Sequence, residues 1–514
     1  MTDSTASRRT TILTLIGIIA LAGVLTLNRL GNADVCGFNE AVEGVFTQQM
    51  VEQGELLFPL LNARTPMYKP PLYHWTATAI DRIAGISHVT TFNLRLPAAL
   101  YGIAGIALTF LFANELLGLS GAVLAGLILC GSYQYIEQAR IGRVDMTLCF
   151  FETLALFTLA RWSRAPNRDG LRYLFAIALG LAVLAKGPVG AVMPAAAAGI
   201  FLVSEKRWTE LRSIASPGPI LIALVIGLSW YAACYFSGRY AFLHRQIGSE
   251  NFGRFFGSLG AMVPWYYVLP LLLNSAPLSL FVPIAVVAAI RTYFKPRSQD
   301  EAGEERQDAT MRLFAIFWFV TVIFFSLAAY KRRSYLLPIW PAASVMLAWI
   351  TMRFARSIKS FGRVLYPSMV AIAVGSAIFN CYYLPRKPIR ECGHDSFQTT
   401  AREINRIVGQ DEPLYSYGLG DEPAALIFYL DRNAPPIAGK LGDAPPGYVI
   451  IPARLWRTEK DRALDLTPVY TSSSGSEPLT LLRRGAALAQ SRSRLKNRCF
   501  SADRRARLRL ARVF

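Results

Sequence analysis

Acidic and basic residues gather where long apolar runs begin or end. After the first run come Asn39, Glu40 and Glu43, whose two glutamates share a helical face at a spacing of three, and then Lys69 in a Lys-Pro-Pro-Leu sequence. A carboxylate there could take a proton from a hydroxyl or amine, and Lys69 could hold a phosphate as a point charge. By themselves, these residues are better explained as solvated charges of an interfacial helix.

The same residue types recur at later boundaries. Asp145 lies two residues from Arg143, and such a carboxylate at a membrane boundary is costly unless it is paired or functional. Lys186 interrupts an apolar stretch, for which snorkelling to the interface is the alternative explanation. The further candidates are Arg254, Lys331, Arg332 and Tyr335. Basic groups repeated on one side predict an anionic ligand, for which a lipid-linked phosphate or pyrophosphate is the natural candidate.

Composition excludes an ordinary soluble protein. Of 514 residues 53% are apolar and 17% charged, against about 25% charged in a soluble domain. In a membrane protein the net charge of +20 serves first to orient the chain and only then to attract anionic partners such as membrane lipids, so we predict no nucleic-acid partner. The seven cysteines form no CxxC pair, and no disulfide framework is implied.

Apolar runs of 17–25 residues predict a polytopic α-helical membrane protein with about eleven spans, and up to thirteen. Loops rich in arginine and lysine then lie inside, which puts the N-terminus in the cytoplasm and the C-terminus outside. The segment 70–85 is interpreted as an interfacial helix. The predicted spans are 11–30, 95–117, 119–137, 144–161, 173–187, 189–204, 218–237, 265–290, 312–330, 335–352 and 365–384.

The sequence predicts that the chain divides into three parts. Residues 1–384 form the transmembrane part, with a long external loop at 31–94. Residues 385–485 change to mixed polar composition with short β-rich runs, which predicts a small periplasmic α/β domain. Residues 486–514 are rich in arginine and are predicted to be a disordered, solvated tail.

Six blocks in order resemble the bacterial inner-membrane glycosyltransferases of the GT-C type, which include the lipid A aminoarabinose transferase and the dolichyl-phosphate-mannose protein mannosyltransferases. The resemblance covers residues 10–350. Its blocks are Asn39-Glu-Ala with Lys69-Pro-Pro-Leu, Arg95-Leu-Pro-Ala-Ala-Leu, Ala139-Arg-Ile-Gly-Arg-Val-Asp-Met, Leu184-Ala-Lys-Gly-Pro-Val, Trp265-Tyr-Tyr, and Lys331 to Tyr335-Leu-Leu-Pro.

This resemblance implies the GT-C fold and an inverting transfer of a sugar from a polyprenyl-phosphate (undecaprenyl-phosphate) donor, without a nucleotide sugar, to a lipid A, other lipid or glycan acceptor on the periplasmic face of the inner membrane. It implies that Lys69 is the motif lysine, that Asp145 is the acid of the second external loop, and that residues 331–335 meet the donor phosphate. No cofactor is firmly implied, and a divalent cation is left open.

The resemblance departs from the family pattern at one position. Where the family usually has an aspartate this chain has Asn39, which cannot accept a proton. Either the base is Glu40 or Glu43, which we prefer to Asp34, whose alternative role is to cap the helix, or the acceptor differs from the lipid A phosphate. Protein O-mannosylation is the alternative within the class. A lipid flippase or transporter is the alternative from another class, but it would place its ionisable residues in the middle of the membrane.

Overall fold

The computed structural model divides into two units, which we describe separately. The first comprises residues 1–33, 46–59 and 66–387, and the second residues 34–45, 60–65 and 388–514. The predicted tail at 486–514 lies outside the described residues. The structure describes residues 2–35, 37–165, 168–257, 260–294, 302–357, 359–387, 397–419, 424–472 and 478–484.

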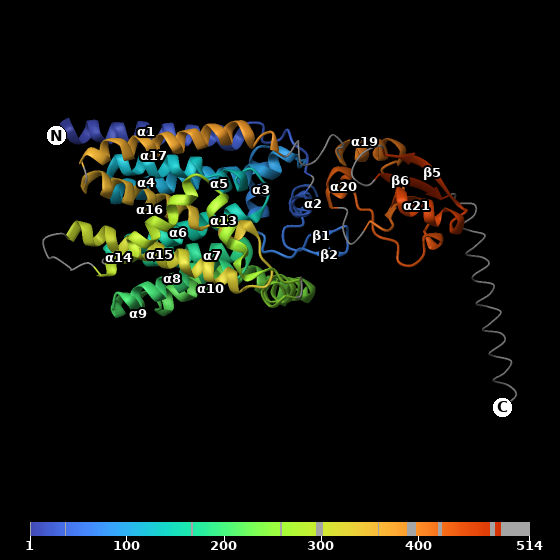
Figure 1. Cartoon of the computed structure of the whole chain (residues 1–514). Helices are drawn as coiled ribbons and strands as arrows, with labels where there is room; N and C mark the ends of the chain where they lie inside the picture. Colours follow the sequence, from blue (N-terminus) through green and yellow to red (C-terminus); the bar gives the residue numbers. More distant parts are fainter. Residues whose placement is uncertain are drawn as a thin grey trace, which may run out of the picture. The chain divides into compact units, whose positions relative to one another are not determined.

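Helices make up the first unit (Figure 1). Its α-helices, including α2, which begins in the second unit, are α1 (Thr2–Leu27), α2 (Phe38–Glu52), α3 (Leu72–Ile83), α4 (Thr91–Gly131), α5 (Tyr133–Gln138), α6 (Val144–Arg164), α7 (Asp169–Lys186), α8 (Val189–Ser204), α9 (Trp208–Ile214), α10 (Pro217–Phe236), α11 (Tyr240–Leu243), α12 (Arg254–Phe256), α13 (Val268–Leu273), α14 (Val282–Arg291), α15 (Ala302–Leu327), α16 (Ile339–Ser357) and α17 (Lys359–Tyr383). Short turns of other helix types are η1 (His244–Gly253), η2 (Pro264–Tyr267), η3 (Leu278–Phe281), η4 (Thr292–Phe294) and η6 (Arg333–Leu336).

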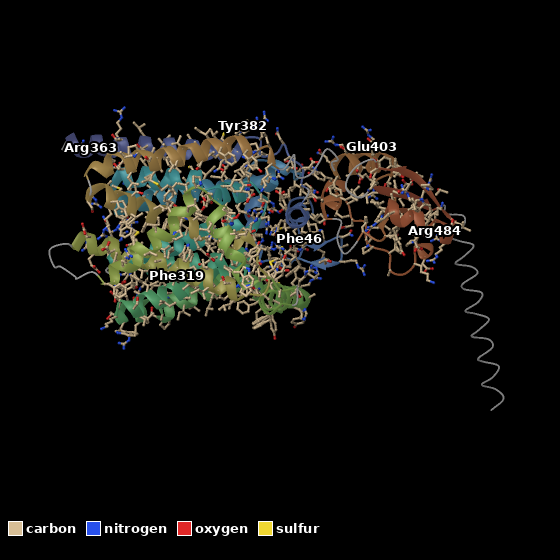
Figure 2. The ribbon with its side chains drawn as sticks, viewed as in Figure 1. Phe46, Phe319, Arg363, Tyr382, Glu403 and Arg484 are labelled. Atoms are coloured by element: carbon tan, nitrogen blue, oxygen red, sulfur yellow. The ribbon has the colours of Figure 1, made fainter. Side chains whose placement is uncertain are left out.

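Several of these helices are long and apolar enough to cross a membrane. By length and composition the described residues contain five, or six if one bent pair counts as a span: Arg8–Leu27, Thr91–Gly131, Pro217–Phe236, Gly303–Leu327, Arg363–Tyr383 and the pair Pro264–Leu273 with Leu278–Phe294. Arg363 and Tyr382 lie toward the two ends of α17 (Figure 2). The helix exposes Ile378 and Phe379, each more than half, a face suited to lipid rather than water. The chain is a multi-pass membrane protein.

Helix α4 is one long element that includes most of two predicted spans, 95–117 and 119–137. Gly118 has φ 78°, a conformation that L side chains rarely adopt, and it breaks the helix at the predicted division between 95–117 and 119–137. The chain folds back there, because Tyr135 Oη donates a hydrogen bond to the carbonyl of Gly102 at 3.0 Å. The boundary predicted from the sequence is therefore a turn between two packed helices.

The predicted span at 265–290 is not one straight helix. Its two helical parts, Pro264–Leu273 and Leu278–Phe294, are bent by 113° at the break between them. Pro270, Pro277 and Pro283 each remove a backbone donor, so a continuous helix through this stretch would lose hydrogen bonds. The helix predicted at 70–85 is α3, whose 12 residues are too few to span a bilayer.

The helices α6, α7 and α8 position the site described below. α7 packs against α6, α8 and α10. Asp145 lies in the first turn of α6, and Arg161 and Arg164 lie near its end, so both sets of charges suit the helix dipole. Gly187, at φ 101°, separates α7 from α8.

Arg140, one of the charges grouped near Asp145 in the sequence, has a structural role. Its guanidinium donates to the carbonyls of Leu25, Thr26 and Asn28 at 2.7–2.9 Å, which are orphan acceptors at the end of α1. Burial, and then the charge of Arg95, lower the pKa of Arg140 to about 10. It remains a cation at neutral pH and ties α1 to the segment before α6.

The second unit contains a four-stranded sheet whose strands follow one another in the order β3 (Leu414–Ser416), β4 (Gly447–Pro452), β6 (Leu479–Arg484) and β5 (Leu466–Thr471). β3 pairs parallel to β4, and the other two pairs are antiparallel. The buried residues Val449, Ile451 and Leu482 form its core. Strands β3, β4 and β6 match the β-rich runs that the sequence predicts at 413–417, 448–452 and 479–482. β5 has mostly exposed residues and gives no alternating signal. The elements are α19 (Phe397–Ile407), β3 (Leu414–Ser416), α20 (Ala424–Leu430), β4 (Gly447–Pro452), α21 (Ala453–Glu459), β5 (Leu466–Thr471) and β6 (Leu479–Arg484); β1 (Leu60–Leu61) and β2 (Thr65–Pro66) form a separate ribbon.

Two segments of the long external loop, 34–45 and 60–65, belong to this second unit. The sequence did not predict this assignment. Asn62 and Ala434 exchange two hydrogen bonds of 2.8 and 2.9 Å. The backbone N–H of Val35 donates to Tyr429 Oη at 2.7 Å. The C-terminal α/β unit therefore holds the loop segment that precedes α2.

Candidate functional site

A cavity of about 380 Å³ lies in the first unit, and we call it the cationic cavity. It is lined by basic and acidic groups together with phenyl rings, so it offers both a charged and an apolar surface. The charged residues are Lys69, Arg143, Asp145, Glu152, Lys186, Glu250, Arg254 and Arg332, and the rings are Phe252, Phe255, Phe256, Phe324 and Phe325, with Tyr330 and Tyr335 among the other lining residues.

Asp145 is the central acid of this cavity. Its Oδ1 lies 2.5 Å from Lys186 Nζ, and its Oδ2 lies 3.0 Å from Arg143 Nη2. The carboxylate is 2% exposed, and a charge at such a position requires partners of this kind. The pairing of Arg143 with Asp145 expected from the sequence is present, and Lys186 joins it from the end of α7 rather than snorkelling to the interface.

A turn of unusual geometry presents Lys186. Gln246, from the π-helical turn η1, donates from Nε2 to Tyr231 Oη at 3.2 Å and to the carbonyl of Lys186 at 3.5 Å. A Cβ on Gly187 would lie 2.4 Å from Gln246 Nε2 and would displace that amide, and the φ of 101° disfavours any side chain there. π-Helical turns occur frequently at functional sites.

Arg254 directly follows η1 and contributes another cationic group to the cavity. Its guanidinium pairs with Glu250 at 2.8 Å and donates to Tyr335 Oη at 3.3 Å. Burial acts to lower the pKa of Arg254, but Tyr335 and Glu250 outweigh it and raise the pKa above its usual range. The Tyr335 ring also lies 4.9 Å from Lys186 Nζ. Arg254, Tyr335 and Lys186 thus form one contiguous surface.

Lys69 lines the cavity and is 6% exposed, which differs from the exposed interfacial lysine that the sequence suggested. The segment before α3 carries it inward, and its Nζ lies 5.0 Å from the centre of the Tyr68 ring. Pro70 and Pro71 keep this segment out of the helix. Lys69 is therefore presented to the cavity rather than to bulk water.

Lys331 and Arg332 have different environments although they are adjacent. Lys331 Nζ donates to the carbonyls of Ala328 at 2.6 Å and Met262 at 3.3 Å, and burial lowers the pKa of its ammonium. It is not among the residues that line the cationic cavity. Arg332 does line it and stacks on the Tyr330 ring at 5.4 Å. Lys331 thus holds the loop through these two bonds, and its contact with the donor phosphate stays a prediction.

The acids of the first external loop lie on α2, in the second unit. Glu40 is 7% and Glu43 1% exposed, so neither is a solvated surface charge. Asn39 and Asp34 are half-buried. These four residues belong to one unit and the cationic cavity to the other, so the choice of base stays a prediction.

Sequence reasoning missed Glu152, Gln246 and Asn251 among the lining residues. Asn251 Nδ2 donates to Gln246 Oε1 at 3.0 Å. Glu152 lies within the apolar run predicted as a span at 144–161, where a single acid stands out little. The feature that could have identified Glu152 is its spacing of seven residues from Asp145, which puts both residues on one face of α6.

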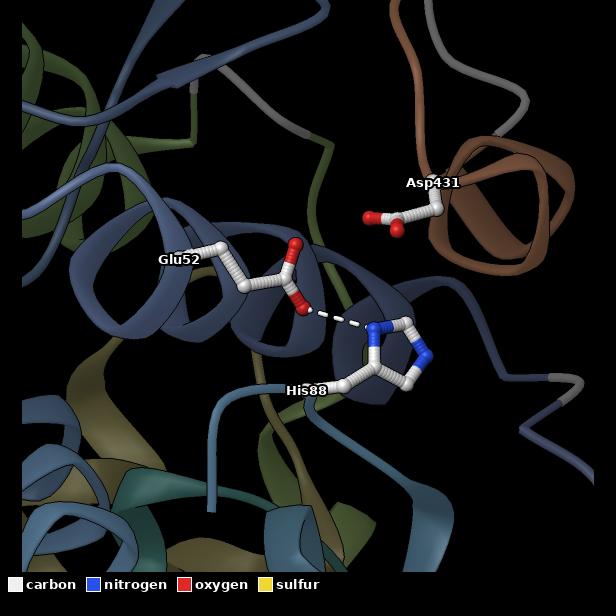
Figure 3. Close-up of side chains that lie close together, drawn as sticks. All are labelled: Glu52, His88 and Asp431. Carbon is white, nitrogen blue, oxygen red and sulfur yellow. Dashed lines mark ion pairs between the residues drawn. The ribbon is translucent and has the colours of Figure 1, made fainter. Parts of the chain in front are cut away.

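Outside the cavity, Glu52 and His88 form an ion pair within the first unit. His88 Nδ1 lies 3.0 Å from Glu52 Oε1, which also accepts a hydrogen bond from the backbone of Val89 (Figure 3). Asp431, also drawn there, belongs to the second unit, and we assign no site to the three residues. The divalent cation left open by the sequence stays an expectation.

Comparison with known proteins gives matches along most of the chain. Residues 68–235 match the dolichyl-phosphate-mannose-protein mannosyltransferase family. An uncharacterized protein of Aquifex aeolicus is 28% identical over 392 residues, covering 75% of this chain and 80% of that protein. The undecaprenyl phosphate-α-4-amino-4-deoxy-L-arabinose arabinosyl transferase 1 of Pseudomonas fluorescens Pf0-1 is 25% identical over 342 residues, covering 63% and 56% respectively. The chain thus spans less than two thirds of that transferase.

Among solved structures, the crystal structure of ArnT from Cupriavidus metallidurans bound to undecaprenyl phosphate superposes with a TM-score of 0.75. The two sequences are 17% identical, and the match covers 92% of this chain and 98% of that one. At this identity the similarity establishes the fold. The GT-C fold implied by the sequence motifs is confirmed.

Proposed function

We propose that this chain, which has the GT-C fold, is a glycosyltransferase that transfers a sugar from a polyprenyl-phosphate donor to a lipid or glycan acceptor. One observation carries the proposal: a single cavity joins five cationic side chains to five phenylalanine rings. A lipid phosphate has one part that fits each surface. The cations neutralise the phosphate, and the rings pack against the prenyl chain.

The proposed sugar transfer is a substitution at the anomeric carbon. An acceptor oxygen attacks the anomeric carbon of the sugar, and the bond from that carbon to the phosphate oxygen breaks, so the configuration inverts. The electron pair leaves with the polyprenyl phosphate, whose charge increases. Lys69, Lys186 and Arg254 stabilise that charge as it develops, in a site whose groups are already held in place.

Asp145 acts in this scheme by orienting cations. Both of its oxygens face a cation, Lys186 on one side and Arg143 on the other. A carboxylate held in this way fixes the two basic groups at the phosphate. The proton of the acceptor hydroxyl goes instead to Glu43 or Glu40 of α2, and an acceptor that is already an anionic phosphate needs no base.

We further propose that the reaction takes place on the periplasmic side of a bacterial inner membrane. The basic loops at 161–172, 205–213 and 353–363 then lie in the cytoplasm. Asp145 at the start of α6, Lys186 at the end of α7 and Pro338 just before α16 line the cationic cavity, and each lies at the end of its helix opposite to these loops. The lipid-linked sugar is thus used outside the cytoplasm.

Release of polyprenyl phosphate tests the proposal. The purified chain in nanodiscs is given undecaprenyl phosphate carrying radiolabelled aminoarabinose, mannose or glucose, with a lipid A precursor as acceptor. Label in the acceptor together with free undecaprenyl phosphate is expected with one of the donors. Absence of both products with every donor and acceptor would overturn the proposal.

A protein acceptor is the second candidate, because the family that matches residues 68–235 is described by protein mannosyl transfer. The same assay separates the two. With undecaprenyl-phosphate mannose as donor and a mixture of unfolded periplasmic proteins as acceptor, label that becomes sensitive to protease favours protein glycosylation. Label that extracts with lipid favours the first proposal.

A further inference from the structure

Glu152 is a buried acid on the wall of the cationic cavity that the scheme above does not use. It is 2% exposed, and its Oε2 has no hydrogen-bond partner among the described residues. Asp145, Leu148 and Glu152 follow one another at spacings of three and four, so one face of α6 lines the cavity. Glu152 lies two turns, about 10 Å, further along the helix than Asp145.

The other acids of the cavity wall are already paired. Asp145 accepts a hydrogen bond from Lys186 and forms an ion pair with Arg143, and Glu250 pairs with Arg254. Lys186 acts electrostatically on Glu152, but its Nζ is bonded to Asp145. A buried carboxyl oxygen without a hydrogen bond costs free energy, and an ionisable residue inside a membrane protein marks a functional site. A bound ligand can supply the missing donor.

The three parts of a polyprenyl-phosphate sugar differ in what they could offer to a carboxyl group. The phosphate is repelled by a carboxylate and is attracted to the cations. The prenyl chain has no donor. The sugar alone carries hydroxyl or amino groups that donate hydrogen bonds. We propose that Glu152 accepts a hydrogen bond from the donor sugar and selects which sugar the enzyme uses. This inference rests on the proposed function.

Binding of two lipids separates this role from a purely structural one. The full chain in nanodiscs is titrated with undecaprenyl phosphate, and separately with undecaprenyl phosphate carrying the sugar that the wild type transfers fastest. For Glu152→Leu we expect about tenfold weaker binding of the sugar-loaded lipid. Binding of the bare lipid phosphate should stay within about twofold. Glu152→Gln keeps an acceptor oxygen and should fall between wild type and Glu152→Leu.

Asp81 supplies a matched control. It is also a buried acid with an oxygen that lacks a hydrogen-bond partner among the described residues, and it does not line the cationic cavity. Asp81→Asn should bind both lipids as the wild type does. If Glu152→Leu does not fold, as judged by its melting curve, the near-isosteric Glu152→Gln decides, with a loss of at least threefold expected for the sugar-loaded lipid alone.

Equal losses for both lipids would overturn the role of Glu152, because they would mean that it shapes the cavity or affects the phosphate. Unchanged binding of both lipids would overturn it as well. Failure of the proposed function is a separate result, since it appears in the wild type as no release of undecaprenyl phosphate. A loss confined to the sugar-loaded lipid, together with altered preference among the three labelled sugars, would support the assignment.

Discussion

Asp145 and Lys186 stand 41 positions apart in the chain, and their Oδ1 and Nζ atoms lie 2.5 Å apart. The first opens α6 and the second closes α7, so the antiparallel packing of the two helices brings them to the same end. The pair therefore exists because of the packing and fixes one cation inside the cavity.

Asp145→Asn should reduce kcat/KM for sugar transfer by more than about tenfold, or about 1.4 kcal/mol, because it releases Lys186 and Arg143. The control is Asp308→Asn, which breaks the ion pair of another buried aspartate with the half-buried Arg353, outside the cavity. That variant should lower the melting temperature and keep the turnover of each folded molecule. If both variants lose only stability, Asp145 is structural.

Lys69→Ala should lower kcat/KM by roughly ten- to a hundredfold, since a charge-assisted hydrogen bond to phosphate contributes about 1.5–3 kcal/mol. Lys69→Arg should recover part of the activity. Turnover and binding of undecaprenyl phosphate are measured together. Full activity of the alanine variant would remove Lys69 from the phosphate site.

Lys331→Met should act differently from Lys69→Ala, although both remove a buried lysine. Lys331 bonds to the carbonyls of Ala328 and Met262, so its loss leaves the buried carbonyl of Ala328 without this donor. We expect a lower melting temperature and a smaller effect on the affinity for undecaprenyl phosphate than Lys69→Ala produces. A selective loss of phosphate affinity without loss of stability would contradict this assignment.

The sequence predicts those site residues that lie where apolar runs end. Lys69, Arg143, Asp145 and Lys186 are visible for this reason, because a charge at a span boundary stands out. Glu152 is hidden inside such a run, and Gln246 acts through hydrogen bonds that depend on the π-helical turn. The α2 acids show another limit: their assignment to the C-terminal unit depends on contacts such as that between Asn62 and Ala434, which local sequence does not encode.

Gly187→Ala tests the turn that presents Lys186. The new Cβ would meet Gln246 Nε2 at 2.4 Å, and φ 101° is strained for alanine. We expect at least a tenfold loss of turnover. Gly199→Ala, within α8 and with no atom within 4 Å of its added Cβ, is the matched control and should behave as wild type. Equal turnover of the two variants would show that this turn does not position Lys186.

The proposed orientation predicts where reporter fusions are active. Alkaline phosphatase joined after Arg390 should fold outside the cytoplasm and be active, whereas the same enzyme inserted between Gln299 and Gln307 should be inactive. The basic loops set this expectation. Cytoplasmic reporters at both sites should give the inverse pattern, and alkaline phosphatase activity only at the second site would reverse the orientation.

Asp81 predicts a pH-dependent stability. Burial raises its pKa to about 6 from the usual 3.8, and a hydrogen bond with Asn93 acts in the opposite direction. Between these two values the folded chain binds more protons at Asp81 than the unfolded chain, so this residue's contribution to stability is present below about pH 4 and is lost as pH rises through 6. The loss amounts to at most about 3 kcal/mol. Asp81→Asn should therefore flatten the melting temperature between pH 4 and 7 relative to wild type and raise it at pH 7. Parallel curves for the two proteins would show that Asp81 titrates alike in both states.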